Sequence, residues 1–474
     1  MINLKIKLAL IKKPLGFPIF SAFIFFSILW LLDFPKPQVD DLFFCGSALN
    51  LAGGGDFTNP FIAWLPGHLY FFQPPVHTYV LTLWLKVFGI SAAALTGFQA
   101  AAYFLNAAAI IAILHRYSSP AWLKYLTPLL LTASFAAIGL RQEPLATAFA
   151  LVGFAIIECD IRKPSLVFLS FLLMFLGMAT APRVTLFAGA LAILAGQRLW
   201  VENSDNKQRR KLFWLAASAC LFTGLIFLWM IHFQAAEFWH IFFLTAKSVS
   251  VRRPLGSYFL AQLGSIQIVL MLTCGMLLAF LFKYRREKSI QLSIALALVF
   301  PAQFFLHFLG NGVGRYFLSL ALFFSITAIL KHISRLNGRG LMFGLICFLV
   351  FMNSGLFVNI FGIVTGEIKS THEGDYHEAK QLASTEQTPL FLDPFAARYV
   401  FDYKMPRGSV DFFFSPPFPR YIIDETNYPE GNYVFGPQWG RGFRQTNEPS
   451  DSQWGFLNWR FYKKPQQIFV IHHY

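Results

Sequence analysis

The residues best suited to chemistry in this chain are two adjacent aspartates, Asp40 and Asp41. A carboxylate that holds an acceptor hydroxyl can orient it and take its proton late in an attack, and an Asp of ordinary pKa suits that role. A second interpretation needs no chemistry: Asp40 caps a short helix over 41–52, Gly53-Gly54-Gly55 ends that helix, and Asp41 lies at the positive end of its dipole. Taken alone, the pair favours this capping role.

Arginines in several later loops could supply positive charge beside those carboxylates. A guanidinium next to a departing phosphate stabilises the transition state, in which the phosphate gains charge, more than the ground state. The alternative role for each arginine is an anchor to lipid headgroups, which fits Arg183 and Arg315 equally well and fits Arg253 better. The polar residues of the outer loops that we consider for ligand binding are Gln73, Arg141, Glu143, Arg183, His240, Arg252, Arg253 and Arg315.

The composition predicts that these residues belong to a membrane protein. Of the 474 residues, 56% are hydrophobic and only 13% are charged, and Phe occurs 56 times. This balance excludes an ordinary soluble protein, and the net charge of +15 does not indicate nucleic acid, because Lys and Arg must first be assigned to the two sides of a bilayer. The five cysteines and the histidines are scattered, so the spacing predicts neither a disulfide framework nor a metal site.

Apolar runs predict about 11 transmembrane helices, of which the first is an uncleaved span over 16–32. The later runs lie near 93–114, 121–139, 145–160, 165–181, 184–199, 213–231, 258–282, 290–309, 316–330 and 341–363. The segment from Val76 to Gly89 is too short to span upright, and we expect it to lie in the outer interface. The cytoplasmic ends then hold 20 of the 39 Lys and Arg residues, against 8 on the opposite side and 11 in the C-terminal region. This bias predicts a cytoplasmic N-terminus and an outer site.

The last part of the chain changes in composition, since Pro, Asn, Asp and Tyr become frequent and no long apolar run appears. We therefore expect two domains: a transmembrane domain over 1–364, with a catalytic first outer loop over 34–92, and an extracytoplasmic α/β domain over 365–474. The pieces that read as strands in this second domain are 389–393, 433–435 and 467–471.

The order of short motifs along this layout resembles the polyprenyl-phosphate-sugar-dependent glycosyltransferases with the GT-C fold. The nearest group is that of the protein mannosyltransferases, aminoarabinose transferases and galacturonosyltransferases. The motifs that carry the resemblance are Asp40-Asp41, Gly55-Asp56-Phe57, Pro74-Pro75 and Lys86-Val-Phe88-Gly89, followed by Arg141-Gln142-Glu143, the stretch from Glu237 to Tyr258, and Arg315-Tyr316-Phe317. Each motif is short and degenerate, so their shared order and shared side of the membrane carry the weight.

The resemblance implies an all-α polytopic bundle in the cell inner membrane, with interfacial helices in the first outer loop. It implies a polyprenyl-phosphate-linked sugar as donor, whose phosphate and sugar would be bound by the polar outer-loop residues named above. It implies a lipid-linked glycan, a lipopolysaccharide component or a protein as acceptor. Asp40 would be the base, and Asp41 would help to hold the acceptor or a divalent cation such as Mg²⁺ or Mn²⁺; no other cofactor is implied. Because a single carboxylate acts opposite the leaving group, the sugar would be inverted.

The sequence also departs from the pattern of that family. Phe72 and Gln73 stand where relatives carry an acidic and a basic residue before the Pro, and Phe43 and Phe44 stand where one branch often carries Arg and Tyr. The arginines of the later loops would have to replace these cations. Two other functions stay open: a transporter or flippase of a lipid-linked anion, which predicts ionisable residues near the bilayer midplane that are sparse here, and a non-catalytic envelope scaffold with the same fold.

Overall fold

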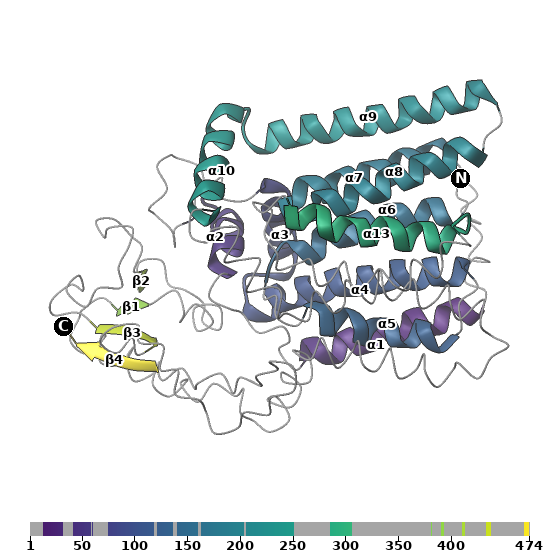
Figure 1. The fold of residues 1–474 in the computed structure, drawn as a ribbon. Helices are drawn as coiled ribbons and strands as arrows, with labels where there is room; N and C mark the ends of the chain where they lie inside the picture. Colours follow the sequence, from purple (N-terminus) through teal and green to yellow (C-terminus); the bar gives the residue numbers. More distant parts are fainter. Residues whose placement is uncertain are drawn as a thin grey trace, which may run out of the picture.

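The computed structural model describes a helical bundle and four short strands (Figure 1). The described residues are 13–31, 41–57, 59, 74–117, 121–135, 140–159, 163–202, 205–250, 285–305, 381, 390–392, 410–412, 433–437 and 469–473. Within these ranges, each apolar run predicted as a span is a helix. The runs near 258–282, 316–330 and 341–363 lie outside the described residues, so the total of 11 spans stays a prediction.

Apolar helices run side by side along one axis and form the core. They are α1 (Lys13–Leu31), α4 (Ala92–Arg116), α5 (Ala121–Phe135), α6 (Glu143–Glu158), α7 (Pro164–Thr180), α8 (Thr185–Glu202), α9 (Asn206–Met230) and α13 (Lys288–Phe305). Three helical stretches among the described residues, 93–116, 182–202 and 206–230, are long and apolar enough to cross a membrane. The described part is therefore that of a helical membrane protein.

Close contact between α6 and α7 depends on two glycines. A Cβ on Gly153 would lie 2.4 Å from the Ser170 carbonyl oxygen, and a Cβ on Gly177 would lie 2.7 Å from that of Ala146. Small residues of this kind let the backbones of two membrane helices approach closely. Gly177 thus brings the end of α7 against the first turns of α6, which begins at Glu143.

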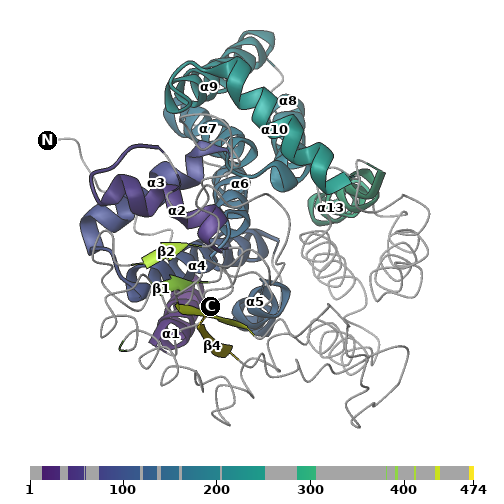
Figure 2. The ribbon, with the colours of Figure 1, turned by 90° about the vertical axis from the view of Figure 1, so that its left-hand side faces the viewer.

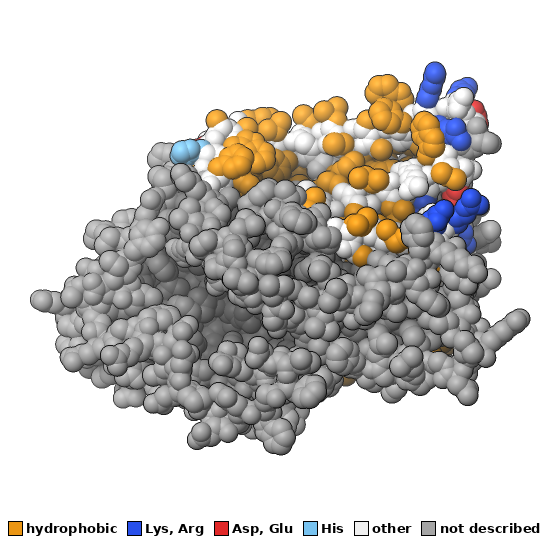
Figure 3. All heavy atoms as spheres, in the orientation of Figure 1, with side chains coloured by type: hydrophobic (Ala, Val, Ile, Leu, Met, Phe, Trp, Pro, Cys, Tyr) orange, Lys and Arg blue, Asp and Glu red, His pale blue; other side chains and the backbone are white. Residues whose placement is uncertain are grey.

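The two ends of the bundle differ in character. The basic end comprises the C-terminal ends of α4, α6 and α8 and the N-terminal ends of α9 and α13, and Lys and Arg side chains gather there (Figure 3). The opposite end, here named the loop end, comprises the start of α6, the short helix η2 (Pro182–Val184) and the helices α2 (Asp41–Ala52), α3 (Pro75–Phe88) and α10 (Ala235–Ser250).

Helices α2, α3 and α10 lie across the bundle axis rather than along it. In the view along the bundle, the core helices are seen end-on while these three are seen lengthwise (Figure 2). Helix α3 begins at a proline and ends before Gly89, whose φ of 85° favours glycine. The segment that we expected to lie in an interface, 76–89, is therefore a separate helix at the loop end and does not run through the bundle.

Four strands form a mixed sheet in the C-terminal region, with the order β2-β1-β3-β4. The strands are β1 (Leu390–Leu392), β2 (Val410–Phe412), β3 (Tyr433–Pro437) and β4 (Phe469–His473). Strand β1 is parallel to β2 and β3, whereas β3 and β4 are antiparallel. Three strands coincide with predicted pieces, and β2 was not predicted. The domain boundary at 364 and 365 lies outside the described residues, so the extent of an α/β domain stays a prediction.

Candidate functional site

The loop end holds an ion pair between two of the residues that the sequence singles out. Glu143 is the first residue of α6, and Arg183 lies in η2. The Arg183 Nη1 atom lies 3.1 Å from Glu143 Oε1; the Glu143 side chain is 1% exposed, whereas that of Arg183 is 32% exposed. A carboxylate in a first helical turn is favoured by the helix dipole. The guanidinium of Arg183 is therefore partly exposed, while the buried carboxylate of Glu143 holds it in place.

The second oxygen of Glu143 differs from the first in its contacts. This atom, Oε2, is buried, and no hydrogen bond from the described part of the chain reaches it. Burial of a carboxylate is costly unless its oxygens find donors or cations. Glu143 therefore contacts Arg183 through one oxygen, while the protein encloses the other.

Helix α2 docks against the turn that carries Arg141. The Arg141 guanidinium carbon lies 5.3 Å from the centre of the Phe44 ring, and the Cys45 thiol contacts the Leu140 carbonyl oxygen at 3.4 Å. A cation over an aromatic ring contributes about 0.5–2 kcal/mol, more where water is excluded. Phe44 lies one helical turn after Asp41, so Arg141 sits beside the N-terminal turn of α2.

Two further side chains support this docking, and neither was predicted to do so. His77 of α3 is buried against the edge of Phe98, with ring centres 5.6 Å apart. Burial lowers the pKa of His77 to about 4, although a hydrogen bond with the Phe44 backbone acts in the opposite direction. Asn106 of α4 donates to the carbonyl oxygens of Ala102 and Pro144, both at 2.8 Å. A neutral His77 and a bridging Asn106 thus tie α2, α3 and the start of α6 to α4.

The turn after α2 is also ordered by side-chain contacts. Asn50 Nδ2 donates to the backbone oxygen and to the Oδ1 atom of Asp56, both at 3.1 Å. Phe57, the next residue, is 2% exposed and stacks on Tyr79 of α3 with ring centres 5.6 Å apart. The motif Gly55-Asp56-Phe57 therefore forms an ordered turn that holds the end of α2 against α3.

No protein-family model, curated protein or solved structure matches this chain. The family therefore stays a resemblance carried by the motifs of the sequence.

The remaining predicted site residues are placed apart from this pair or lie beyond the described ranges. Asp40, Gln73, Arg252, Arg253 and Arg315 lie outside the described residues, as does the side chain of Asp41. His240 lies on an exposed side of α10, and no contact between described residues joins it to Glu143 or Arg183. In the part of the chain that the structure describes, no group of three or more His, Cys, Asp or Glu side chains could hold a metal ion.

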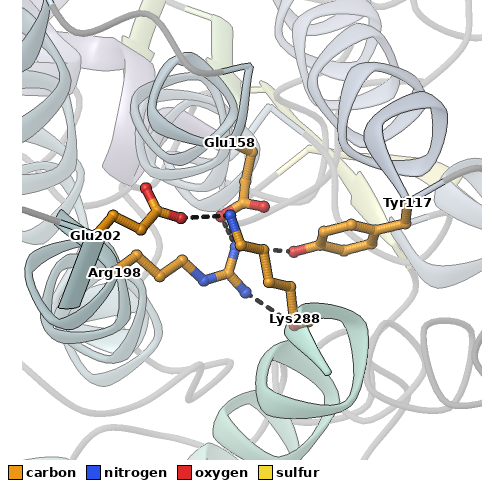
Figure 4. Close-up of polar contacts among 5 residues, drawn as sticks. All are labelled: Tyr117, Glu158, Arg198, Glu202 and Lys288. Carbon is orange, nitrogen blue, oxygen red and sulfur yellow. Dashed lines mark hydrogen bonds and ion pairs between the residues drawn. The ribbon is translucent and has the colours of Figure 1, made fainter. Parts of the chain in front are cut away.

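A second charged cluster, which we did not predict, lies at the basic end (Figure 4). Arg198 of α8 forms an ion pair with Glu158 at the end of α6, donates to the Tyr117 hydroxyl at 3.1 Å, and donates to the Lys288 carbonyl oxygen at 2.8 Å. The Lys288 Nζ atom in turn lies 2.5 Å from Glu202 Oε1. From the sequence, Arg198 is one of the 20 Lys and Arg residues assigned to the cytoplasmic ends. It joins the ends of four helices, with 5% of its side chain exposed.

Proposed function

We propose that this protein is an inverting glycosyltransferase of the GT-C type, which moves a monosaccharide from a polyprenyl-phosphate donor to an envelope lipid, glycan or protein. The observation that carries this proposal is the convergence at the loop end: Arg141 lies over the first turns of α2, and Arg183 is held by Glu143. Separate segments thus bring two guanidiniums to the end of the bundle where the helix that starts at Asp41 docks.

The proposed reaction uses these groups in distinct roles. An acceptor hydroxyl oxygen bonds to the anomeric carbon as the bond from that carbon to the lipid phosphate breaks, and Asp40 takes the hydroxyl proton. The leaving phosphate is already a weak base, so it needs charge stabilisation rather than an acid. Arg183 suits that task because its guanidinium is both accessible and fixed by a buried carboxylate.

Arg141 would contribute a second cation to the site. The Arg141 guanidinium lies over the Phe44 ring. This contact explains why an aromatic residue suits position 44, in the region where one branch of the family often has Arg and Tyr. The ring holds a cation supplied by another loop in place of a cation in α2 itself. Asp41 would then hold the acceptor or a divalent cation such as Mg²⁺ or Mn²⁺.

The same two ends support the proposed location in the cell. Lys and Arg gather at the basic end, and the tendency of such residues to remain in the cytoplasm supports a cytoplasmic basic end. The loop end, the site and the C-terminal sheet would then face the outside of the inner membrane. In Figure 1 the sheet lies at the same end as α2, which suits a role in covering the site or holding the acceptor.

Complementation of a deletion strain tests this proposal. The strain is expected to accumulate a polyprenyl-phosphate sugar and to lack the matching glycan, and the wild-type gene should restore both. Asp40→Asn should reduce transfer by roughly 10²–10⁴-fold, the usual contribution of a general base, while the protein still reaches the membrane.

Asp205→Asn is the matched control for Asp40→Asn. Asp205 caps α9 at the basic end by accepting a hydrogen bond from the Lys207 backbone, and Asn caps a helix about as well as Asp. This variant should complement normally. Full complementation by Asp40→Asn would refute the enzymatic proposal. If the wild-type protein moves the lipid-linked donor across the membrane but transfers no sugar, the result would favour a flippase.

A further inference from the structure

Helix α10 has three distinct faces. At about 100° per residue, Phe238 and Ile241 fall on one face, Trp239 and Phe243 on the next, and Glu237 and His240 on the third. The first face is buried, with exposures of 2% for Phe238 and 1% for Ile241. The second is aromatic yet open, with exposures of 50% for Trp239 and 62% for Phe243. Such a helix suits a position where its first face meets the protein, its second an apolar medium and its third water.

The open aromatic face continues the surface of α9. Only 11% of the most apolar stretch of α9 is buried within the protein, and that helix is long and apolar enough to cross a membrane. Trp229 near its end and Phe233 just beyond it are 59% and 70% exposed. Hydrophobic side chains extend along the described surface from the basic end toward a histidine at the loop end (Figure 3).

The turn between α9 and α10 also carries an exposed aromatic ring. His232 and Phe233 have φ angles of 53° and 61°, in the left-handed region that favours glycine. Phe233 keeps a large side chain there although its ring is mostly outside the protein. The turn therefore adds a third exposed ring to the aromatic surface formed by Trp239 and Phe243.

The buried face of α10 leads directly to the first loop. Phe238 and Ile241 pack in one cluster with Phe57 and Ile231. Tyr79 of α3 stacks on Phe57, and its hydroxyl donates to the Met230 carbonyl oxygen at 3.3 Å. Movement of α10 would therefore displace the turn that contains Asp56.

We infer that α10 is an interfacial anchor. It lies along the boundary between lipid headgroups and acyl chains at the loop end, inserts Trp239, Phe243 and Phe233 among the lipids, and holds the first loop in place through Phe57. The phospholipid bilayer is the occupant of this face because the face is continuous with α9, lies across the bundle axis, and carries the aromatic side chains that are enriched at membrane interfaces. This role does not depend on the reaction that the protein performs.

Spin labels on α10 test the anchor in the full chain, reconstituted in phospholipid nanodiscs. A nitroxide is attached to Phe243→Cys or, as the control, to His240→Cys, with the five native cysteines replaced. Collisions with oxygen, which concentrates in lipid, and with a water-soluble nickel chelate are then compared. The label at 243 should favour oxygen, and the label at 240 should favour nickel. Equal access of nickel to both positions, or shielding of position 243 from both agents, would overturn the anchor.

The link to the first loop has its own measurement. Hydrogen exchange of the 53–57 backbone is compared between the wild type and a double variant, Trp239→Ser with Phe243→Ser. The exchange should become several-fold faster in the double variant and stay unchanged in Trp214→Ser, which alters an aromatic residue that is 66% exposed near the other end of α9. Unchanged exchange in the double variant would show that α10 does not hold the loop.

Discussion

The two ends of the bundle each hold a buried carboxylate paired with an arginine, but only one of these two arginines is accessible to solvent. At the basic end, 5% of the Arg198 side chain is exposed and groups from α4, α6 and α13 contact it. At the loop end, 32% of the Arg183 side chain is exposed. The same pair of residue types thus serves architecture where it is enclosed and can serve binding where its cation faces out.

Loss of the enclosed cation should cause the largest change in stability. Arg198→Ala leaves Glu158 buried without its cation, which typically costs about 3–5 kcal/mol, and should lower the yield of folded protein and its melting temperature in detergent. Lys288→Ala is the control, because its pair with Glu202 is partly exposed and such pairs contribute about 0–1 kcal/mol. Equal stability of the two variants would contradict a structural role for Arg198.

Acidification should loosen the packing of α2 and α3 at the loop end. His77 has a pKa of about 4 in the folded protein against 6.5 for an exposed histidine, because burial opposes its charge. The unfolded segment binds more protons between these values, so stability is complete above pH 6.5 and falls as the pH decreases toward 4, by about 3 kcal/mol in all.

Hydrogen exchange of α2 and α3 against pH measures this effect. Exchange should accelerate below pH 6.5 in the wild type after correction for the intrinsic rate. In His77→Gln the acceleration should disappear, since glutamine does not titrate. An acceleration that persists in His77→Gln would assign the acid sensitivity to another group.

A methyl group on Gly177 should produce a smaller change, concentrated at the loop end. Gly177→Ala would place a Cβ against the Ala146 carbonyl oxygen near the start of α6, which should cost about 1–3 kcal/mol through displaced backbone. Gly196→Ala is the matched control in α8, where nothing lies within 4 Å of the added atom, and should stabilise the helix slightly. Thermal unfolding of the two variants gives the comparison, and a stable Gly177→Ala would show that α6 and α7 are not closely packed.

The helices could be predicted from sequence because their signal is local. Each long apolar run in the described residues became a helix, and the short, charged run with Lys86 became the separate helix α3. The strands β1, β3 and β4 were predicted from short aromatic pieces for the same reason. Strand β2 follows no comparable run and was missed.

The contacts of the site could not be predicted because they join distant segments. Glu143 and Arg183 are 40 residues apart, and nothing in either motif identifies the other as its partner. Phe44 reads as a departure from the family pattern until Arg141 is seen over its ring. A lone His77 or Arg198 in an apolar run gives no sign of whether it is buried or exposed, since that depends on the helices packed around it.

The central claim is that Arg183 serves binding of an anionic group while Glu143 holds it in place. The most direct test compares the transfer activity of two variants. The first is a double variant, Arg183→Ala with Glu143→Gln, and the second is the single variant Arg183→Lys. The double variant removes the cation without leaving a buried charge, so it should fold with a melting temperature near that of the wild type while transfer falls by roughly 10²–10³-fold. Arg183→Lys keeps a charge and should retain part of the activity. Wild-type transfer by the folded double variant would contradict the account.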